Sequence, residues 1–430
     1  MKILIISPYY YPDLSPRAHR WSSIAEVWAR QGHEVHVLSA RHRLRPPGEM
    51  RNGVHRHVAG FHSLKNVWSC YRPAMTSAES KTLSPSGNSF ARRLNDGFLK
   101  PFYFPDDAFI WYPAAVKALK KLTARSDFDL LISSALPFTA HLAALKIKKR
   151  LPYAIWIADT GDPFAFQPEH PLNNTFLYGK LNRHLERKVA ETADFVTLTH
   201  EGARELYERE IPEAAGKFKV IHPLYRPPQK LPSKVSGIDP SALKLGYFGS
   251  FFPCIREPRP MLRFWAEFVL NYPELSAGLE LHFYGNIALG FMKDFRAFPV
   301  LRDCLHLHGL VSKKEVAVAM QRMNFLLNVG NTTTFQLPSK SVDYLAAGRP
   351  VINFCRGEKD TFARFLAEKV PILNIYGENY PTEKLRDFVM IHKNAKSRPA
   401  DITPYTPARI GEEYLQLFRE GRRVRPDGGN

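Results

Sequence analysis

Cysteine is scarce in this chain of 430 residues, and no two cysteines have the close spacing of a paired motif. Their scatter argues against a disulfide framework and against a zinc site, and it is typical of a protein in a reducing compartment. The four cysteines are Cys70, Cys254, Cys304 and Cys355.

Long apolar runs are missing too. The N-terminal strand candidate has only four apolar residues before Ser7, too few for the core of a signal peptide, so it indicates a buried strand. The longest uncharged run, residues 130–145, is shorter than the ~20 residues that a membrane-spanning helix needs. It is also interrupted by Ser133, Ser134, Pro137 and His141.

The first expected loop lacks glycine. Residues 2–7 are expected to form a strand, residues 15–32 a helix that Ser15 caps, and residues 34–38 the next strand, which is the pattern of a βαβ unit. The loop over residues 8–15 has no glycine, so the Gly-x-Gly-x-x-Gly fingerprint of dinucleotide binding is absent. An oxidoreductase with such a cofactor therefore loses its main support.

Acidic residues are outnumbered by 60 Lys and Arg to 41 Asp and Glu, a net charge of +19. Residues 41–100 hold eleven basic and three acidic residues, a net +8. A mixture of basic and aromatic side chains suits an anionic membrane surface or a nucleic acid, and a basic insertion without a partner is the third interpretation. The aromatic residues in or just after this window are Trp68, Tyr71, Phe90, Phe98, Phe102, Tyr103 and Phe104.

The order of strands and helices predicts an α/β fold with two doubly wound domains. The expected N-terminal domain covers residues 1–228, with the basic and aromatic insertion at about 63–105. The second domain covers residues 242–400, and a terminal helix and tail cover residues 401–430. The Pro- and Ser-rich stretch 226–241 is the expected linker. Two such domains imply a cleft that binds ligands beyond the carboxyl ends of the strands.

The remaining expected elements follow from short apolar runs and from helical periodicity. Strands are expected at residues 129–133, 153–158, 195–199, 218–221, 243–248, 279–284, 305–307, 325–327 and 351–354. Helices are expected at residues 112–122, 138–146, 181–193, 201–208, 260–270, 313–320 and 339–347.

The stretch from residue 328 to residue 350, NVGNTTTFQLPSKSVDYLAAGRP, contains the strongest site pattern. Ser339 is the expected N-cap of a helix that Gly348 ends. The N-terminus of a helix binds anions, and Lys340 adds positive charge there. Asp343, one turn along, can accept hydrogen bonds from vicinal hydroxyls. Such a site can hold a nucleoside diphosphate, whereas the alternative interpretation is a capped surface helix.

Four segments together resemble retaining nucleotide-sugar glycosyltransferases of the GT-B fold, in the family 4 group. They are residues 1–40, LKLGYFGSF at 243–251, LHLHGLVSKKEV at 305–316 and LPSKSVDYLAAGRPVINF at 337–354. The resemblance covers most of the chain in the same order, and the last segment is the most specific. It implies two Rossmann-like domains facing across a cleft, with residues 405–419 as a helix that crosses back to the first domain.

The resemblance implies that the second domain holds the donor. Ser339, Lys340 and Asp343 match the helix that holds the diphosphate and ribose, with Asp where the family usually has Glu. Arg256 and Arg259 follow the turn at Gly249-Ser250 and match residues that contact the diphosphate. One of the two arginines is alternatively a solvated surface residue.

Other donor contacts match less closely. Gly309 and Leu310 correspond to the turn that contacts the base. Phe335 stands where the family often has a second Glu that contacts the sugar, which leaves Asn331 and Gln336 as the nearby polar candidates. This departure keeps a catalytically silent protein among the alternatives.

On the acceptor side, the resemblance points to loops after the strands of the first domain. Arg17 can reach a phosphate, although a surface role is equally compatible with its position. Asp159 and Asp162 follow an expected buried strand and can bond sugar hydroxyls, while Asp162 before Pro163 also suits a turn. His141 is a further candidate, for which a packed core histidine is the alternative.

The resemblance implies transfer of a hexose-like sugar with retention of configuration and without a metal or another cofactor. Arg256, Lys340 and Asp159 form the expected catalytic group. The expected partners are a nucleotide-sugar donor, a lipid-linked or oligosaccharide acceptor and an anionic membrane surface, with no nucleic acid. The expected place is cytoplasmic, at the inner face of the membrane, in polysaccharide or glycolipid assembly. A non-catalytic sugar-nucleotide or nucleic-acid binding protein is the alternative.

Overall fold

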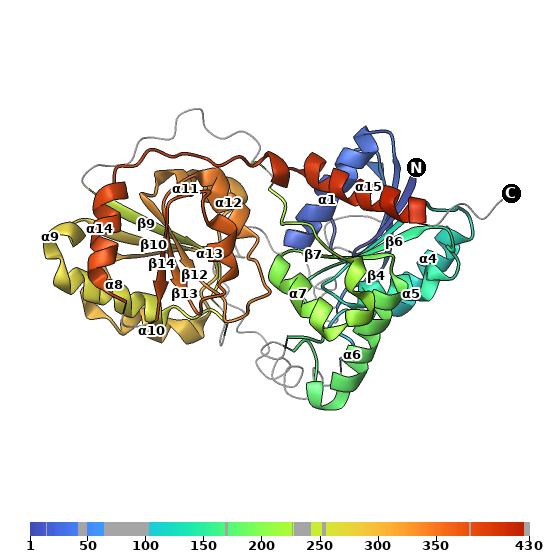
Figure 1. Cartoon of the computed structure of the whole chain (residues 1–430), viewed down its shortest axis with the longest axis horizontal. Coiled ribbons are helices and arrows are strands. Elements are labelled where there is room, and N and C mark those ends of the chain that lie inside the picture. The colour runs from blue at the N-terminus through green and yellow to red at the C-terminus, as the bar shows by residue number, and fades with distance from the viewer. Residues whose placement is uncertain are drawn as a thin grey trace, which may run out of the picture. The chain divides into compact units, whose positions relative to one another are not determined.

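The chain folds into two compact units, which we describe from a computed structural model (Figure 1). Unit 1 comprises residues 1–222 and 407–430, and unit 2 comprises residues 223–406. The expected linker, apart from residue 227, and nearly all of the basic insertion lie outside the described residues. The structure describes residues 1–13, 15–41, 50–63, 103–167, 171–225, 227, 242–251, 255–377 and 380–424.

Unit 1 is built on an eight-stranded sheet with the order β3-β4-β2-β1-β5-β6-β7-β8. All neighbours pair in parallel except β3 and β4. The strands β1 and β5 are buried on both faces, as expected for parallel strands covered by helices. The strands are β1 (Lys2–Ile6), β2 (Glu34–Arg41), β3 (Met50–Arg51), β4 (Val54–Phe61), β5 (Leu130–Ser134), β6 (Ile155–Gly161), β7 (Phe195–Leu198) and β8 (Phe218–Val220).

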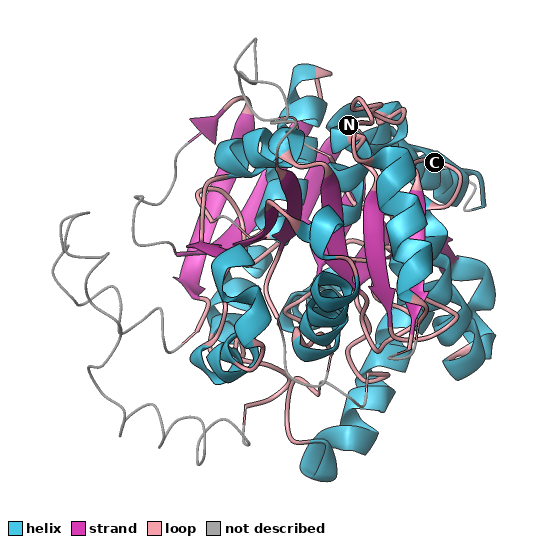
Figure 2. Ribbon diagram, turned by 90° about the vertical axis from the view of Figure 1, so that its left-hand side faces the viewer, coloured by secondary structure: helices cyan, strands magenta, loops and turns pink. Residues whose placement is uncertain are grey.

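Figure 2 shows helices on either side of the strands. The first begins as expected: the Ser15 side chain accepts a hydrogen bond from the Ala18 backbone N–H, and Pro16 occupies the first helical position. Gly32 after this helix has a φ of +86°, a conformation that favours glycine. The helices are α1 (Pro16–Arg30), α4 (Trp111–Thr123), α5 (Thr139–Lys148), α6 (Thr175–Thr192), α7 (Glu201–Glu210) and α15 (Pro407–Val424).

Helix α15 returns to unit 1 and packs beside α1 (Figure 1), which confirms the expected terminal helix. Two glycines permit this close packing. A Cβ on Gly411 would lie 3.0 Å from Trp28 Nε1, and a Cβ on Gly421 would lie 3.0 Å from Ile155 Cδ1. A side chain at either position would require its neighbours to shift.

Unit 2 has a six-stranded, fully parallel sheet with the order β11-β10-β9-β12-β13-β14. Its strands are β9 (Leu243–Phe248), β10 (Leu279–Tyr284), β11 (Leu305–Gly309), β12 (Phe325–Val329), β13 (Val351–Cys355) and β14 (Ile372–Tyr376). Its helices are α8 (Arg259–Asn271), α9 (Pro273–Ser276), α10 (Met292–Arg296), α11 (Lys313–Arg322), α12 (Lys340–Ala347), α13 (Thr361–Leu366) and α14 (Thr382–His392).

Both units therefore have the doubly wound α/β architecture that the sequence predicts. The sequence did not predict β3, β4, β14, α9, α10, α13 and α14. Strand β4 was missed because its sequence, VHRHVAGF, places polar side chains on a half-buried strand instead of an apolar run. Among the described residues, no helix is both long enough and apolar enough to cross a membrane.

Candidate functional site

The sheet of unit 2 has its topological switch point between β9 and β12. Strands β10 and β11 lie on one side of β9, and β12 to β14 lie on the other. Ligands of doubly wound sheets bind at such a point, beyond the carboxyl ends of the strands. Gly249 and Ser250 follow β9, and residues 330–339 lead from β12 into α12.

Three polar side chains converge on Gly249. A Cβ built on this glycine would lie 3.6 Å from Lys340 Nζ, 3.6 Å from the Tyr247 hydroxyl and 3.8 Å from Arg256 Nη1. Gly249 has a φ of +148°, and its carbonyl oxygen lies against the Cα side of Gly285. Because Gly249 has no side chain, Lys340 and Arg256 lie close to its backbone.

Lys340, at the start of α12, is the unusual member of this group. Its Nζ atom is buried, and no hydrogen-bond partner contacts it among the described residues. It lies 4.3 Å from the ring centre of Tyr247 and 5.6 Å from that of Tyr344. Burial lowers the pKa of Lys340 well below its usual value, the Arg256 charge lowers it further, and Asp360 acts in the opposite direction.

Arg256 is bonded to neutral oxygens. Its Nε and Nη2 atoms donate to Asn331 Oδ1 at 3.1 and 2.6 Å, and Nη1 donates to the Ser250 carbonyl at 3.4 Å. The side chain is 8% exposed. Two buried basic groups therefore adjoin without a carboxylate hydrogen-bonded to either, and an anion bound here would compensate both.

The helix α12 starts at Lys340 and ends as expected. Gly348 has the left-handed conformation, and its N–H bonds to the Tyr344 carbonyl at 3.1 Å. The expected capping by Ser339 is wrong, because its backbone is already helical and its side chain makes no capping hydrogen bond. Its side chain is consequently not held by the helix end.

Asp343 lies one turn into α12 and is half-buried. Burial raises the pKa of its carboxyl to about 6, while Lys313 lowers it. At neutral pH the Asp343 carboxyl is mostly ionised and can accept two hydrogen bonds.

The turn after β11, expected to contact the base, is exposed to solvent. Gly309 has a φ of +69°, and Leu310 is 79% exposed.

Asn331 belongs to this group through Arg256, whereas Arg259 and Gln336 have other partners. Arg259 is 53% exposed at its side chain and pairs with Asp294 at 3.1 Å, which matches the surface alternative. The Gln336 side-chain oxygen accepts a hydrogen bond from Thr333 Oγ1 at 3.0 Å. Phe335 is buried, 7% exposed, and packs into unit 2 where a glutamate would be solvated or ligand-bound.

Asp159 is not positioned for catalysis, which corrects the expectation from the sequence. The residue is 1% exposed on β6. Its carboxylate pairs with Arg17 Nη1 at 2.7 Å and lies 3.8 Å from Arg20 Nε. It also accepts hydrogen bonds from Trp21 Nε1, Thr197 Oγ1 and the Tyr414 hydroxyl at 3.1, 3.0 and 2.9 Å.

This arrangement joins α1, β6, β7 and α15 through one buried carboxylate. Burial opposes the ionised form, but the two arginines outweigh it, so the pKa of Asp159 is lowered. Arg20 also donates to the Tyr414 hydroxyl at 2.8 Å and to the His222 carbonyl at 2.8 Å. The network is structural and holds the returning helix on unit 1.

The remaining acceptor-side candidates belong to the same region. Arg17 Nη2 also donates to the Thr160 carbonyl at 2.9 Å, so its guanidinium is held inside unit 1. His141 is fully buried, bonded to Ser133 and Thr160, and burial lowers its pKa to about 3. The packed-core alternative therefore holds for His141. Burial raises the pKa of Asp162, and the Arg17 charge lowers it.

A polar group that the sequence did not reveal lies after β1 and β4 in unit 1. The Tyr9 hydroxyl bonds to His62 Nε2 at 2.5 Å, and the two ring centres lie 4.5 Å apart with the ring planes tilted by 52°. Asp13 and Asp107 act electrostatically on both side chains. This group follows the carboxyl ends of β1 and β4, where acceptor-binding loops are expected. The tyrosine-rich turn after β1 was visible in the sequence. His62 could not be placed beside it, because the sequence did not predict β4.

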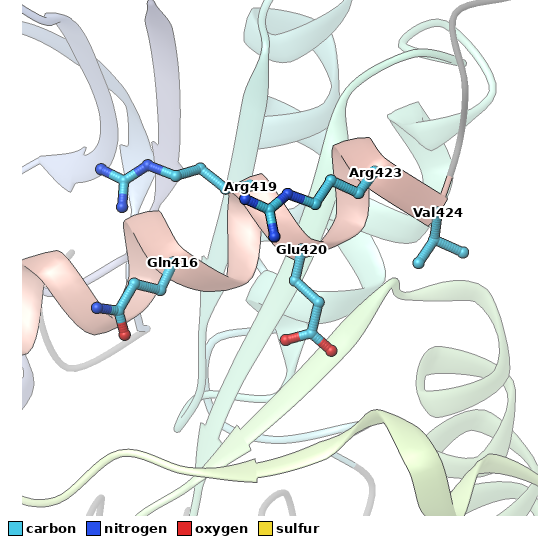
Figure 3. A pocket seen from close by; sticks show the side chains of 5 residues that line it. All are labelled: Gln416, Arg419, Glu420, Arg423 and Val424. Atoms are coloured by element: carbon cyan, nitrogen blue, oxygen red, sulfur yellow. The ribbon is translucent and has the colours of Figure 1, made fainter.

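A hollow along α15 carries less chemistry (Figure 3). The labelled side chains point away from the helix in different directions. Arg419 pairs with Glu412 at 2.7 Å, and Glu420 pairs with Lys219 at 3.2 Å. These charges are already compensated at the surface, so the group around Gly249 remains the better candidate site. The lining residues are Gln416, Arg419, Glu420, Arg423 and Val424.

The chain is similar to known proteins in sequence and in fold. Residues 18–223 match the family described as glycosyl transferase 4-like domain. Sucrose-phosphate synthase from Thermosynechococcus elongatus aligns with a TM-score of 0.62 and 13% identity, covering 98% of this chain and 99% of that chain. HepE of Anabaena in complex with UDP and glucose aligns with a TM-score of 0.59 and 12% identity, covering 98% and 100%.

A third similar structure is AviGT4, a glycosyltransferase involved in avilamycin A biosynthesis, with a TM-score of 0.51 and 11% identity over 99% of this chain and 98% of that chain. No curated protein sequence matches this chain. At these identities the structural likeness establishes the fold.

Proposed function

We propose that this chain, a GT-B protein with a glycosyl transferase 4-like domain at residues 18–223, transfers a sugar from a nucleotide-sugar donor to a glycan acceptor. The observation that carries the proposal is the buried Lys340 ammonium without a hydrogen-bond partner, beside Arg256 at the switch point of unit 2. A diphosphate supplies the missing negative charge. HepE, similar in fold, is in complex with UDP and glucose, which makes a uridine diphosphate sugar the first donor to test.

The chemistry follows from where the positive charge lies. As the bond between sugar and phosphate breaks, negative charge grows on the departing diphosphate, and Lys340 and Arg256 stabilise that charge from fixed positions. We propose that the acceptor hydroxyl attacks from the face of the leaving group and gives its proton to the leaving phosphate, so configuration is retained. Asp343 holds the ribose hydroxyls, and no metal is required because the protein supplies the cations.

For the acceptor, we propose the group of Tyr9 and His62 in unit 1. A phenol and an imidazole in contact can donate to and accept from sugar hydroxyls without adding charge. Two nearby carboxylates, Asp13 and Asp107, extend the set of acceptors. This replaces Asp159, whose hydrogen-bonding capacity is used inside unit 1.

We further propose that unit 1 attaches to an anionic membrane that presents a lipid-linked acceptor. The N-terminal end of α6 exposes three apolar side chains: Phe176 is 95% exposed, Leu177 50% and Leu181 43%. The exposed charged residues from 175 to 188 are all basic, since Glu186 is buried. Apolar side chains beside lysine and arginine match the interface of an anionic bilayer. The exposed basic residues are Lys180, Arg183, Arg187 and Lys188.

Thermal unfolding against a panel of nucleoside diphosphates and nucleotide sugars, with and without EDTA, tests the donor site. A ligand at ~100 times its dissociation constant adds about 2.7 kcal/mol. We expect a shift for one base that EDTA leaves unchanged. A shift that EDTA abolishes contradicts the metal-independent site, and no shift with any nucleotide contradicts the proposal. Binding without sugar transfer would support the non-catalytic alternative.

Co-sedimentation with vesicles tests the membrane proposal separately. Wild-type protein is expected to bind vesicles that contain anionic lipid at low salt, and the Phe176→Ser, Leu177→Ser variant is expected to bind less. Leu289→Ser is the matched control, because Leu289 is 90% exposed in unit 2. Equal binding by wild type and both variants would refute the role of α6 and leave the donor site untouched.

A further inference from the structure

The same group of polar side chains occurs on the sheet of each unit and plays no part in the proposed reaction. One strand carries Glu-x-His, and the parallel neighbouring strand carries His-x-His. In each group the first histidine lies in register with the first histidine of the next strand. Cluster 1 comprises Glu34, His36, His55 and His57 on β2 and β4, and cluster 2 comprises Glu280, His282, His306 and His308 on β10 and β11.

The two clusters agree in geometry as well as in sequence. In cluster 1, His36 Nε2 bonds to Glu34 at 2.9 Å and His36 Nδ1 bonds to His57 at 3.0 Å. The corresponding distances around His282 in cluster 2 are 2.8 and 2.9 Å. In both clusters the first histidine stacks on its cross-strand neighbour at 4.7 Å. A group that recurs in this detail on two separate sheets calls for one shared explanation.

We propose that each cluster binds one divalent transition-metal ion, and that this ion is Zn²⁺. In cluster 1, Glu34, His36 and His55 each offer a ligand atom, and these atoms lie within 4.8 Å of one another. The corresponding three residues of cluster 2 do the same. Zinc binds imidazole nitrogen and carboxylate oxygen at about 2.0–2.2 Å. The three donor atoms must draw closer to share one ion, with solvent as the fourth ligand.

The fourth residue of each cluster has a different role. A histidine that binds a metal through one ring nitrogen usually donates its other N–H to a neighbouring acceptor, which fixes the ring. In cluster 1, His57 Nε2 lies 3.0 Å from His36 Nδ1 and provides this acceptor, leaving His36 Nε2 for the ion. His308 provides it in cluster 2. The sequence argued against a zinc site from its cysteines alone, and that argument did not consider sites made of histidine and glutamate.

The surroundings allow a cation to enter. Lys2 and Lys244 contact the cluster glutamates at 2.9 and 3.1 Å. Both lysine side chains are 26% exposed, so each can turn to solvent when a divalent ion takes the carboxylate. Entry is from the side of His55 and His306, which are only partly buried.

Titration of the untagged, metal-stripped chain with Zn²⁺ against a chromophoric chelator measures the number of sites. We expect two ions per chain. His55→Ala and His306→Ala are the informative variants because neither ring is buried, and each is expected to bind one ion, while the double variant binds none. His184→Ala, an exposed histidine on α6, is the matched control and is expected to bind two.

Cobalt provides the second readout. Wild-type protein loaded with Co²⁺ is expected to show the visible absorption of four-coordinate cobalt, halved in each single variant. Circular dichroism checks that the variants fold. Wild-type protein that binds no zinc at micromolar concentration would overturn the proposal, and so would a double variant that still binds two ions. Nucleotide-induced stabilisation is measured in parallel, so failure of the metal sites and failure of the donor site are distinguishable.

Discussion

Lys340→Met is the change that tests the candidate site most directly, because it is expected to raise stability while it removes function. Methionine fills the same space without charge. An unpaired buried ammonium costs several kcal/mol, of which the contacts with Tyr247 and Tyr344 recover about 2 kcal/mol. We therefore expect the free energy of unfolding to rise by about 1–3 kcal/mol. For a unit of this size, each kcal/mol raises the melting temperature by about 2–4 °C.

Nucleotide binding is expected to change in the opposite direction. A hydrogen bond from a charged group contributes about 1.5–3 kcal/mol, so the loss of Lys340 weakens diphosphate binding by about 10- to 100-fold. At a concentration that stabilises the wild type by about 2.7 kcal/mol, the variant gains only about 0.4–1.4 kcal/mol. Turnover is expected to fall by about 10²- to 10³-fold, as for the loss of one fixed donor.

The measurement is thermal unfolding in a buffer free of phosphate and sulfate, since either anion would occupy the site and hide the gain. Lys314→Met is the control, because Lys314 is exposed on α11. A variant that melts below the wild type without nucleotide, yet keeps the full nucleotide shift and turnover, would refute the assignment of Lys340.

Three further changes test residues of unit 1. Asp159→Asn leaves the partly buried Arg17 and the buried Arg20 without their carboxylate and is expected to lower the free energy of unfolding in urea by about 3–5 kcal/mol; unchanged stability with lost turnover would restore a catalytic role. Burial raises the pKa of Glu186 from 4.5 to about 7, so the folded state keeps this proton to a higher pH than the unfolded state does. The contribution of Glu186 to the free energy of unfolding therefore falls by about 3 kcal/mol as the pH rises from 4.5 to 7. Glu186→Gln is expected to remove that slope, whereas the exposed Glu201→Gln keeps it. Tyr9→Phe is expected to lower turnover about 3- to 10-fold through acceptor binding, and an altered nucleotide shift would argue against that role.

Much of the fold followed from local signals in the sequence. The strand Leu243–Phe248 was predicted with its observed bounds because apolar residues buried on both faces form short uninterrupted runs. Gly348 marked the end of α12 because the chain needs a left-handed residue there. The segment at residues 337–354 located the candidate donor site, since strand end, helix start and basic residue follow one another along the chain.

Contacts between distant residues could not be predicted in this way. Asp159 looked like a ligand at a strand end, but its bonding partners come from residues as far away as Tyr414. Arg256 and Arg259 are equivalent in the sequence, yet only the first meets Lys340, because Asp294 pairs with the second. Burial of Lys340 depends on Tyr247 and Tyr344, which lie on two different elements.

A comparison of the two units explains why we expect an anion to bind to unit 2 and not to unit 1. Both have the same strand order around their switch points, and both bury basic side chains near them. In unit 1 Arg17 and Arg20 already share the carboxylate of Asp159, so a bound anion would have to compete with it there. In unit 2 no carboxylate is hydrogen-bonded to Lys340 or Arg256 among the described residues, and the positive charge is left for a ligand. The distinction between a structural and a binding role thus depends on whether the fold supplies the counter-charge, which a count of basic residues does not reveal.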